Sequence, residues 1–264
     1  MTEPDLIAAR LEIAQSAARA AGSLALELFH DRENLIVETK DDALDMVSPA
    51  DREAEDIIRA RISAVFPEDG ILGEEGGAHS GTSGLTWVID PIDGTVPFVS
   101  GLPHWCVAIA IQSEHGTEAG VVFHPLSDEM FTARHGAGAQ LNGKSLRIKD
   151  SVLLSNSLTG IGASHRTTPD HVADICSKLM AKGGMFYRNG SGALMLAAVA
   201  AGRLGGYYEP HMHAWDCLAG LLLVREAGGR TLPMPAGAAL SEGGVVLAAA
   251  DRVWPDLAEI TGYP

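Results

Sequence analysis

Apolar side chains near the start of the chain recur at the spacing of an amphipathic helix. Between residues 6 and 29 this pattern predicts a long helix that packs on a sheet. A second helix is predicted from residue 49 to about 65, because Ser48 suits the N-cap and Pro49 the first helical position. Asp51 falls in the first turn of this helix. Between the two helices the pattern predicts a strand over 35–39 and a charged loop over 40–45.

Short apolar runs predict a strand that begins at residue 71 and leads into Glu74-Glu75, and a buried strand over 85–89. Closely spaced strands are then expected over residues 106–112, 119–123 and 130–134, with glycine-rich turns between short strands over 136–143. This succession is typical of an antiparallel meander.

Helices and strands alternate in the second half of the chain. The helices are predicted over residues 169–181, 190–201, 214–227 and 252–260, and the strands over 185–188, 204–209 and 245–249. We therefore expect an N-terminal α+β half, residues 1–150, and a C-terminal α/β half, residues 151–264, which share one core and form a single catalytic unit.

The strand predicted over 85–89 leads into two aspartates, Asp90 and Asp93. Pro91 between them has a fixed φ and no N–H, so we expect it to end the strand. Gly94 and Thr95 then suit the opening of a helix. Two carboxylates beside free N–H groups are typical of a site for Mg²⁺ and phosphate. The same pattern is also typical of a capped turn with two solvated aspartates.

Three other acidic positions lie near the predicted ends of elements: Asp51, Glu74-Glu75 and Asp216. Each by itself fits a solvated loop or an acid in the first turn of a helix. Together with the central pair they indicate a site for two or three cations, as in two-metal hydrolysis. A zinc site is disfavoured, because the nearest histidine pair, His211 and His213, lacks the usual ligand spacing.

The composition restricts the class of partner. The chain has 264 residues and a formal net charge of −15, whereas a nucleic-acid backbone is bound by clustered Lys and Arg. Its three cysteines form no C-x-x-C pair, which favours a reducing, cytoplasmic compartment. The sequence carries no signal-peptide pattern and no apolar run of membrane-spanning length. We therefore expect neither a nucleic-acid polymer nor a membrane as partner.

Taken together, these motifs resemble those of the inositol monophosphatase family, in the same order and over nearly the whole chain. The matching segments are Gly73-Glu74-Glu75, residues 87–95 with Phe98, Tyr207-Tyr208-Glu209, and Trp215-Asp216 running into Ala227-Gly228-Gly229. The resemblance implies a layered α/β fold of the αβαβα type, Mg²⁺-dependent and Li⁺-sensitive phosphatase activity, and a homodimer.

The resemblance also implies a role for each matching residue. Glu74, Asp90 and the Ile92 carbonyl correspond to ligands of a first metal ion. Asp90, Asp93 and Asp216 correspond to those of a second, and Glu74 to a contact of a third, weaker ion. The positions that match catalytic residues are Asp51, Thr95 and Glu74, the first two orienting and deprotonating water. The positions that match substrate contacts are Asp93, Gly94, Thr95, Gly190, Ser191, Glu209 and Asp216.

Two stretches depart from the family pattern and leave the substrate open. Val96-Pro97-Phe98 stands where the family often has Thr-Asn-Phe, and residues 100–105 resemble histidinol-phosphatase branches. We expect a small phosphorylated metabolite, with inositol monophosphate as the leading substrate. Histidinol phosphate, fructose 1,6-bisphosphate and 3′-phosphoadenosine 5′-phosphate are the alternatives. A non-catalytic regulatory protein that keeps the fold is the alternative of a different class.

Overall fold

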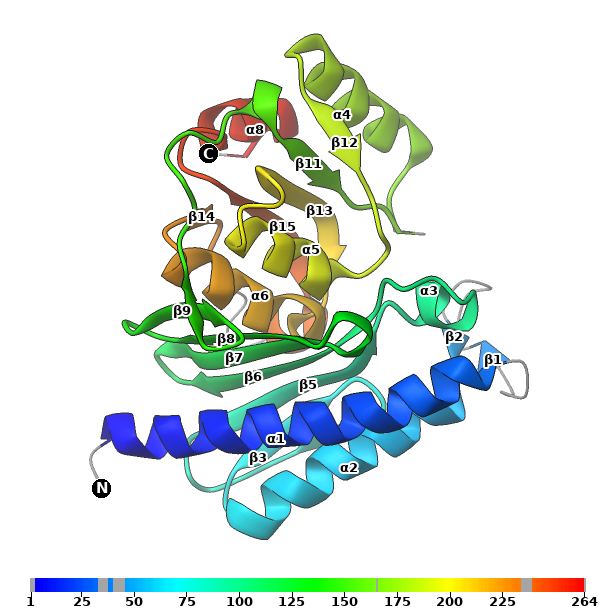
Figure 1. Cartoon of the computed structure of the whole chain (residues 1–264), viewed down its shortest axis with the longest axis vertical. Coiled ribbons are helices and arrows are strands. Elements are labelled where there is room, and N and C mark those ends of the chain that lie inside the picture. The colour runs from blue at the N-terminus through cyan, green and yellow to red at the C-terminus, as the bar shows by residue number, and fades with distance from the viewer. Residues whose placement is uncertain (1–2, 33–37, 40–45, 165, 234–238, 264) are drawn as a thin grey trace.

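The computed structural model describes residues 3–32, 38–39, 46–164, 166–233 and 239–263. Helices and sheets alternate in five layers (Figure 1), which confirms the predicted αβαβα architecture. Two long helices, α1 (Glu3–His30) and α2 (Pro49–Val65), form the first layer against an eight-stranded sheet. The middle layer is α5 (Gly192–Ala200) and α6 (Ala214–Glu226). Beyond a five-stranded sheet lie α4 (Pro169–Ala181) and α8 (Trp254–Thr261).

The large sheet has the strand order β10-β9-β8-β7-β6-β5-β3-β4. Its strands are β3 (Gly70–Gly73), β4 (Gly77–His79), β5 (Thr86–Asp93), β6 (Cys106–Ser113), β7 (Gly116–His124), β8 (Glu129–Arg134), β9 (Gly138–Leu141) and β10 (Lys144–Leu146). From β5 to β10 each strand is antiparallel to the next, which confirms the predicted meander. Both faces are covered by helices, and successive side chains of a strand face opposite ways. Val88 therefore packs with α6, whereas Trp87 and Ile89 pack with α1 and α2.

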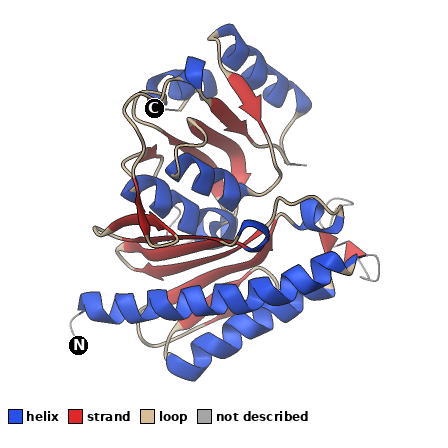
Figure 2. Cartoon of the chain, in the orientation of Figure 1, coloured by secondary structure: helices blue, strands red, loops and turns tan. Residues whose placement is uncertain are grey.

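The smaller sheet is drawn above the large one in Figure 2 and has the order β12-β11-β13-β15-β14. Its strands are β11 (Leu158–Ile161), β12 (Met185–Tyr187), β13 (Gly206–Met212), β14 (Arg230–Thr231) and β15 (Gly244–Ala249). Helix α6 lies between the two sheets, so nearly its whole circumference is buried. The division into 1–150 and 151–264 stays a prediction, although each sheet is built from one side of that boundary.

The expectation that Pro91 ends its strand is wrong. Strand β5 continues to Asp93, and its register against β6 shifts between Asp90 and Asp93. Asp90 pairs with Ala108 and Asp93 with Cys106, so β5 carries one extra residue and bulges there. A proline is tolerated at such a bulge because the hydrogen-bond ladder is already interrupted.

Several local predictions are confirmed and a few elements were missed. Ser48 is the N-cap of α2, and Gly94 precedes the short helix α3 (Thr95–Val99). Strands β4, β11 and β14 and the short helix α7 (Ala239–Glu242) were not predicted. The predicted loop over 40–45 lies outside the described residues. Of the strand over 35–39, only β1 (Glu38–Thr39) is described, paired with β2 (Met46–Val47). Across the described helices, none combines the length and apolar character needed to cross a membrane.

Candidate active site

Three aspartates meet between the large sheet and the middle helices. Asp90 and Asp93 come from the bulged end of β5, and Asp216 from the first turn of α6. One carboxylate oxygen of each lies within 4.8 Å of the other two. Asp90 and Asp93 are buried, and Asp216 is half-buried. The structure thus brings together three of the predicted metal ligands from positions up to 126 residues apart.

Burial and mutual repulsion disfavour the charged forms of these carboxylates. Burial, followed by the charges of Glu74 and Asp93, raises the pKa of Asp90 well above its ordinary value. Burial also raises the pKa of Asp93, and it raises that of Asp216 to about 7. A hard cation relieves such repulsion, and an all-oxygen ligand set is what Mg²⁺ prefers. The donors present therefore fit Mg²⁺.

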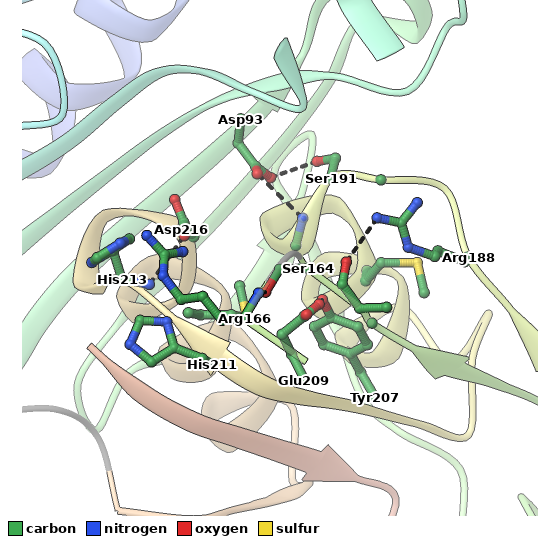
Figure 3. A pocket seen from close by; sticks show the side chains of 16 residues that line it. Asp93, Ser164, Arg166, Arg188, Ser191, Tyr207, Glu209, His211, His213 and Asp216 are labelled. Carbon is green, nitrogen blue, oxygen red and sulfur yellow. Dashed lines mark hydrogen bonds between the residues drawn. The ribbon is translucent and has the colours of Figure 1, made fainter. Parts of the chain in front are cut away.

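Asp93 is held by the N-terminal end of α5, as Figure 3 shows. The Ser191 hydroxyl donates to its carboxylate at 2.5 Å, and the backbone N–H groups of Ala193 and Gly192 donate at 2.7 and 3.2 Å. The Cys106 thiol lies 3.7 Å from the same carboxylate. These bonds fix the orientation of Asp93. The sequence near Asp93 does not predict them, because Ser191 is 98 residues away.

Glu74 follows β3 beside the aspartate cluster. Strands β3 and β5 are parallel, with Gly73 opposite Ile89, and the Glu74 N–H donates to the Ile89 carbonyl at 3.2 Å. Glu74 therefore comes level with Asp90 and raises its pKa. Its carboxylate is not one of the three that converge within 4.8 Å. Glu74 lies at the edge of the cluster, and its metal contact stays a prediction.

Asp51 and Thr95 lie close together although they are 44 residues apart. The Thr95 hydroxyl is 3.4 Å from an Asp51 carboxylate oxygen and 3.2 Å from the Ile92 carbonyl, so its single proton can be donated to either. Asp51 also accepts bonds of 2.8 Å from the N–H and the hydroxyl of Ser48, which caps α2. Burial raises the pKa of Asp51 to about 6. A carboxyl group with such a pKa is suited to accept a proton near neutral pH.

Gly94 and Gly190 adopt backbone conformations that other residues rarely adopt. Their φ angles are +97° and +92°. A Cβ on Gly94 would lie 2.6 Å from the His104 carbonyl oxygen, and one on Gly190 would lie 2.8 Å from a Pro97 side-chain atom. Both positions therefore require glycine, and the chain turns tightly beside Thr95 and Ser191.

A pocket of about 180 Å³ opens beside Asp93 and Asp216. The predicted substrate contacts Gly190, Ser191 and Glu209 also line it, whereas Gly94 and Thr95 do not. Glu209 lies within β13, where the register against β15 shifts, so the expectation that it ends a strand is wrong.

The Glu209 carboxylate occupies the space beside Gly162, which has no side chain. The Tyr207 hydroxyl donates to this carboxylate at 2.7 Å. A Cβ on Gly162 would lie 1.5 Å from a Glu209 oxygen, so only glycine leaves room for this carboxylate. Burial raises the pKa of Glu209 to about 7. Glu209 is therefore a fixed hydrogen-bonding group in the pocket wall.

Sequence analysis gave no role in the pocket to Arg166, Arg188, His211 or His213, which also line it. Figure 3 shows the two histidines on the Asp216 side of the pocket and Arg188 on the Tyr207 side. Arg188 donates to the Ala163 carbonyl at 3.0 Å and so ties together the chain after β11 and the chain after β12. The spacing of His211 and His213 within and just after a strand was the one available signal, since alternate residues face the same way.

Known proteins share this sequence and fold over nearly its full length. The model of the inositol monophosphatase family matches residues 7–261. An inositol-1-monophosphatase of Rhizobium meliloti is 38% identical over 253 residues, which cover 95% of this chain and 94% of the relative. The Nus factor SuhB of Haemophilus influenzae is 38% identical over 247 residues, 92% of each chain.

A solved structure agrees with these sequence matches. The extragenic suppressor protein suhB from Bartonella henselae superposes with a TM-score of 0.89 at 33% identity, covering 96% of this chain and 98% of that one. The family match, the relatives and the shared fold lead to one conclusion. The chain belongs to the inositol monophosphatase family.

Proposed function

We propose that this protein is a Mg²⁺-dependent phosphomonoesterase that hydrolyses a small polyol phosphate, with inositol monophosphate as the leading substrate. The observation that carries the proposal is the convergence of Asp90, Asp93 and Asp216 beside a pocket. A structural scaffold gains nothing from three crowded, mutually repelling carboxylates, two of them buried, because they destabilise the fold unless a cation is bound. The inositol-1-monophosphatase of Rhizobium meliloti supports the choice of substrate.

The three aspartates, Glu74 and the Ile92 carbonyl would hold two or three ions. Bound Mg²⁺ would supply neutralisation of the phosphate dianion and acidification of water. The carboxylates bind and position the ions, and the hydrogen bonds from α5 keep Asp93 aimed at them. The N–H groups of Gly94 and Thr95 hold the phosphate, and the surrounding electrostatics carry most of the rate acceleration.

Asp51 and Thr95 handle the proton of the attacking water. The Thr95 hydroxyl accepts a hydrogen bond from water and donates its own proton toward Asp51, which lies 3.4 Å away. Asp51 then holds the proton at a carboxylate oxygen. Proton transfer of this kind contributes about 10²–10⁴-fold to a rate. Glu74, beside Asp90, is the third proposed catalytic residue.

Gly190, Ser191 and Glu209 line the side of the pocket that would take the alcohol. Glu209 accepts hydrogen bonds, and a ring of hydroxyl groups presents donors to it. The protonated amine of histidinol phosphate would also suit Glu209, so this substrate is the second candidate. A relative from Haemophilus influenzae is named a Nus factor, and this name supports the alternative of a non-catalytic regulatory protein. We further propose that the protein forms a homodimer and that Li⁺ inhibits it.

A phosphate-release screen tests the function. The purified protein is incubated with inositol 1-phosphate, histidinol phosphate, fructose 1,6-bisphosphate or 3′-phosphoadenosine 5′-phosphate, each with Mg²⁺ and with a chelator. We expect Mg²⁺-dependent release with inositol 1-phosphate at the highest kcat/KM. The control is the Asp216→Asn variant, which removes one charge from the cluster. The absence of Mg²⁺-dependent release from all four substrates would refute the phosphatase and favour the regulatory alternative.

A further inference from the structure

We propose that Glu55 and Arg59 of α2 are positioning residues that fix Glu74 and thereby set the affinity of the site for Mg²⁺. The inference rests on the proposed function, because it takes Glu74 as a contact of a metal ion. Neither residue belongs to the site described above, and both lie on the helix that contributes Asp51 from its first turn.

The Glu55 carboxylate is buried and fully engaged. One of its oxygens accepts from Arg59 Nε at 2.6 Å and from the Gly76 N–H at 2.8 Å. The other accepts from the Glu75 N–H at 2.9 Å. Arg59 completes the set, because its Nη2 donates to the Gly77 carbonyl at 2.6 Å. The pair therefore binds the backbone of the three residues that directly follow Glu74.

The turn after β3 lies so close to this pair that side chains are excluded. A Cβ on Gly73 would lie 2.3 Å from a Glu55 carboxylate oxygen, and one on Gly76 would lie 2.6 Å from the same atom. Gly73 and Gly76, which flank Glu74 and Glu75, therefore pack directly against α2. Glu55 and Arg59 are four residues apart on the helix, so their side chains meet on one face of it.

Glu74 is consequently held from both directions along the chain. Its own N–H is bound to the Ile89 carbonyl in the sheet, and the next two N–H groups are bound to Glu55. The carboxylate of Glu74 therefore leaves the backbone at a fixed point beside Asp90.

A turn between two short strands does not need a buried ion pair for its stability. Such a pair costs desolvation free energy, which its attraction repays only in part. The β3–β4 ladder already closes the turn by pairing Gly73 with Gly77. The geometry points instead to accurate placement of Glu74. Residues that orient metal ligands typically change metal affinity by about 10–100-fold when they are altered.

The test compares Glu55→Gln with Glu53→Gln, an exposed residue on the same helix that undergoes the same loss of charge. Calorimetry measures Mg²⁺ binding, and hydrolysis of p-nitrophenyl phosphate is followed across a Mg²⁺ titration. We expect Glu55→Gln to weaken Mg²⁺ binding about 10-fold or more. Its kcat at saturating Mg²⁺ should remain close to that of the wild type, and Glu53→Gln should change neither quantity.

Arg59→Lys provides a second variant that keeps the charge but loses the two-pronged donor. We expect a weakening of Mg²⁺ binding in the same direction, and this variant decides the matter if Glu55→Gln fails to fold. Wild-type Mg²⁺ affinity in the folded variants, with only a lower melting temperature, would overturn the positioning role. A wild-type protein that neither binds Mg²⁺ nor releases phosphate would overturn the proposed function itself, which is a separate result.

Discussion

Replacing Glu209 with Gln should make the fold more stable at alkaline pH and leave it little changed at acidic pH. Burial raises the pKa of Glu209 from 4.5 to about 7, so between these values the folded state binds more protons than the unfolded state. Stability then falls as the pH rises from about 5 through about 7 and levels off above. A tenfold change in acid strength is worth about 1.4 kcal/mol, which limits the penalty at alkaline pH to about 3 kcal/mol. Glu209→Gln removes this penalty while its carbonyl oxygen can still accept the Tyr207 hydroxyl proton.

Urea unfolding of the chelator-treated protein measures this effect at about pH 5 and about pH 8.5. We expect Glu209→Gln to exceed the wild type by about 2 kcal/mol more at the higher pH than at the lower. Glu53→Gln, at an exposed position on α2, is the control and should show no pH-dependent difference. If the free energies of unfolding of Glu209→Gln and wild type differed by the same amount at both pH values, the raised pKa of Glu209 would be refuted.

The same variant separates substrate recognition from support of the metal site. The kcat/KM for inositol 1-phosphate should fall, because ring hydroxyls lose their charged acceptor, whereas that for p-nitrophenyl phosphate should barely change. Equal losses on both substrates would show that Glu209 acts on the metal cluster or on the fold and would remove the residue-level support for a polyol substrate.

Three further predictions concern the reaction itself. Asp93→Asn should lower kcat by about 100-fold or more, because a charge near the phosphate is lost, and wild-type turnover at saturating Mg²⁺ would contradict its place in the site. Thr95→Ala should lower kcat by about 10²–10⁴-fold while calorimetry still finds Mg²⁺ bound, and a parallel loss of Mg²⁺ affinity would reduce Thr95 to a structural residue. Li⁺ should inhibit hydrolysis uncompetitively with respect to substrate, as expected from the family resemblance. Turnover that is insensitive to Li⁺ would place the protein in another branch of the family.

Local features of the site were predictable from the sequence because neighbouring residues determine them. Ser48 and Pro49 predict where α2 begins, and Asp51 then falls in the first turn of that helix. The acidic positions at the ends of predicted elements indicated a shared cation site, and the family resemblance assigned each of them a role as a ligand. Nothing near Asp93 indicates that Ser191 will bind it, because that contact depends on how α5 packs against the large sheet.

The course of β5 past Pro91 was mispredicted for a similar reason. Proline rules describe one strand in isolation, whereas the bulge arises from the pairing of β5 with β6. The placement of Glu74 beside Asp90 likewise depends on the parallel register of β3 and β5, which a single sequence does not encode locally.

The bulge in β5 also determines to which face of the sheet the side chains after it point. In a regular strand, residues three apart point to opposite faces, so Asp90 and Asp93 would be separated by the sheet. The extra residue at the bulge resets the alternation and turns both carboxylates toward α6, where Asp216 meets them. If the strand kept its length but lost the bulge, every acidic side chain would remain in the sequence and yet Asp90 and Asp93 would face opposite sides of the sheet. Within such a fold a metal site of this kind can be lost through a change in strand pairing alone, so a descendant could keep all its acidic residues and retain only a binding role.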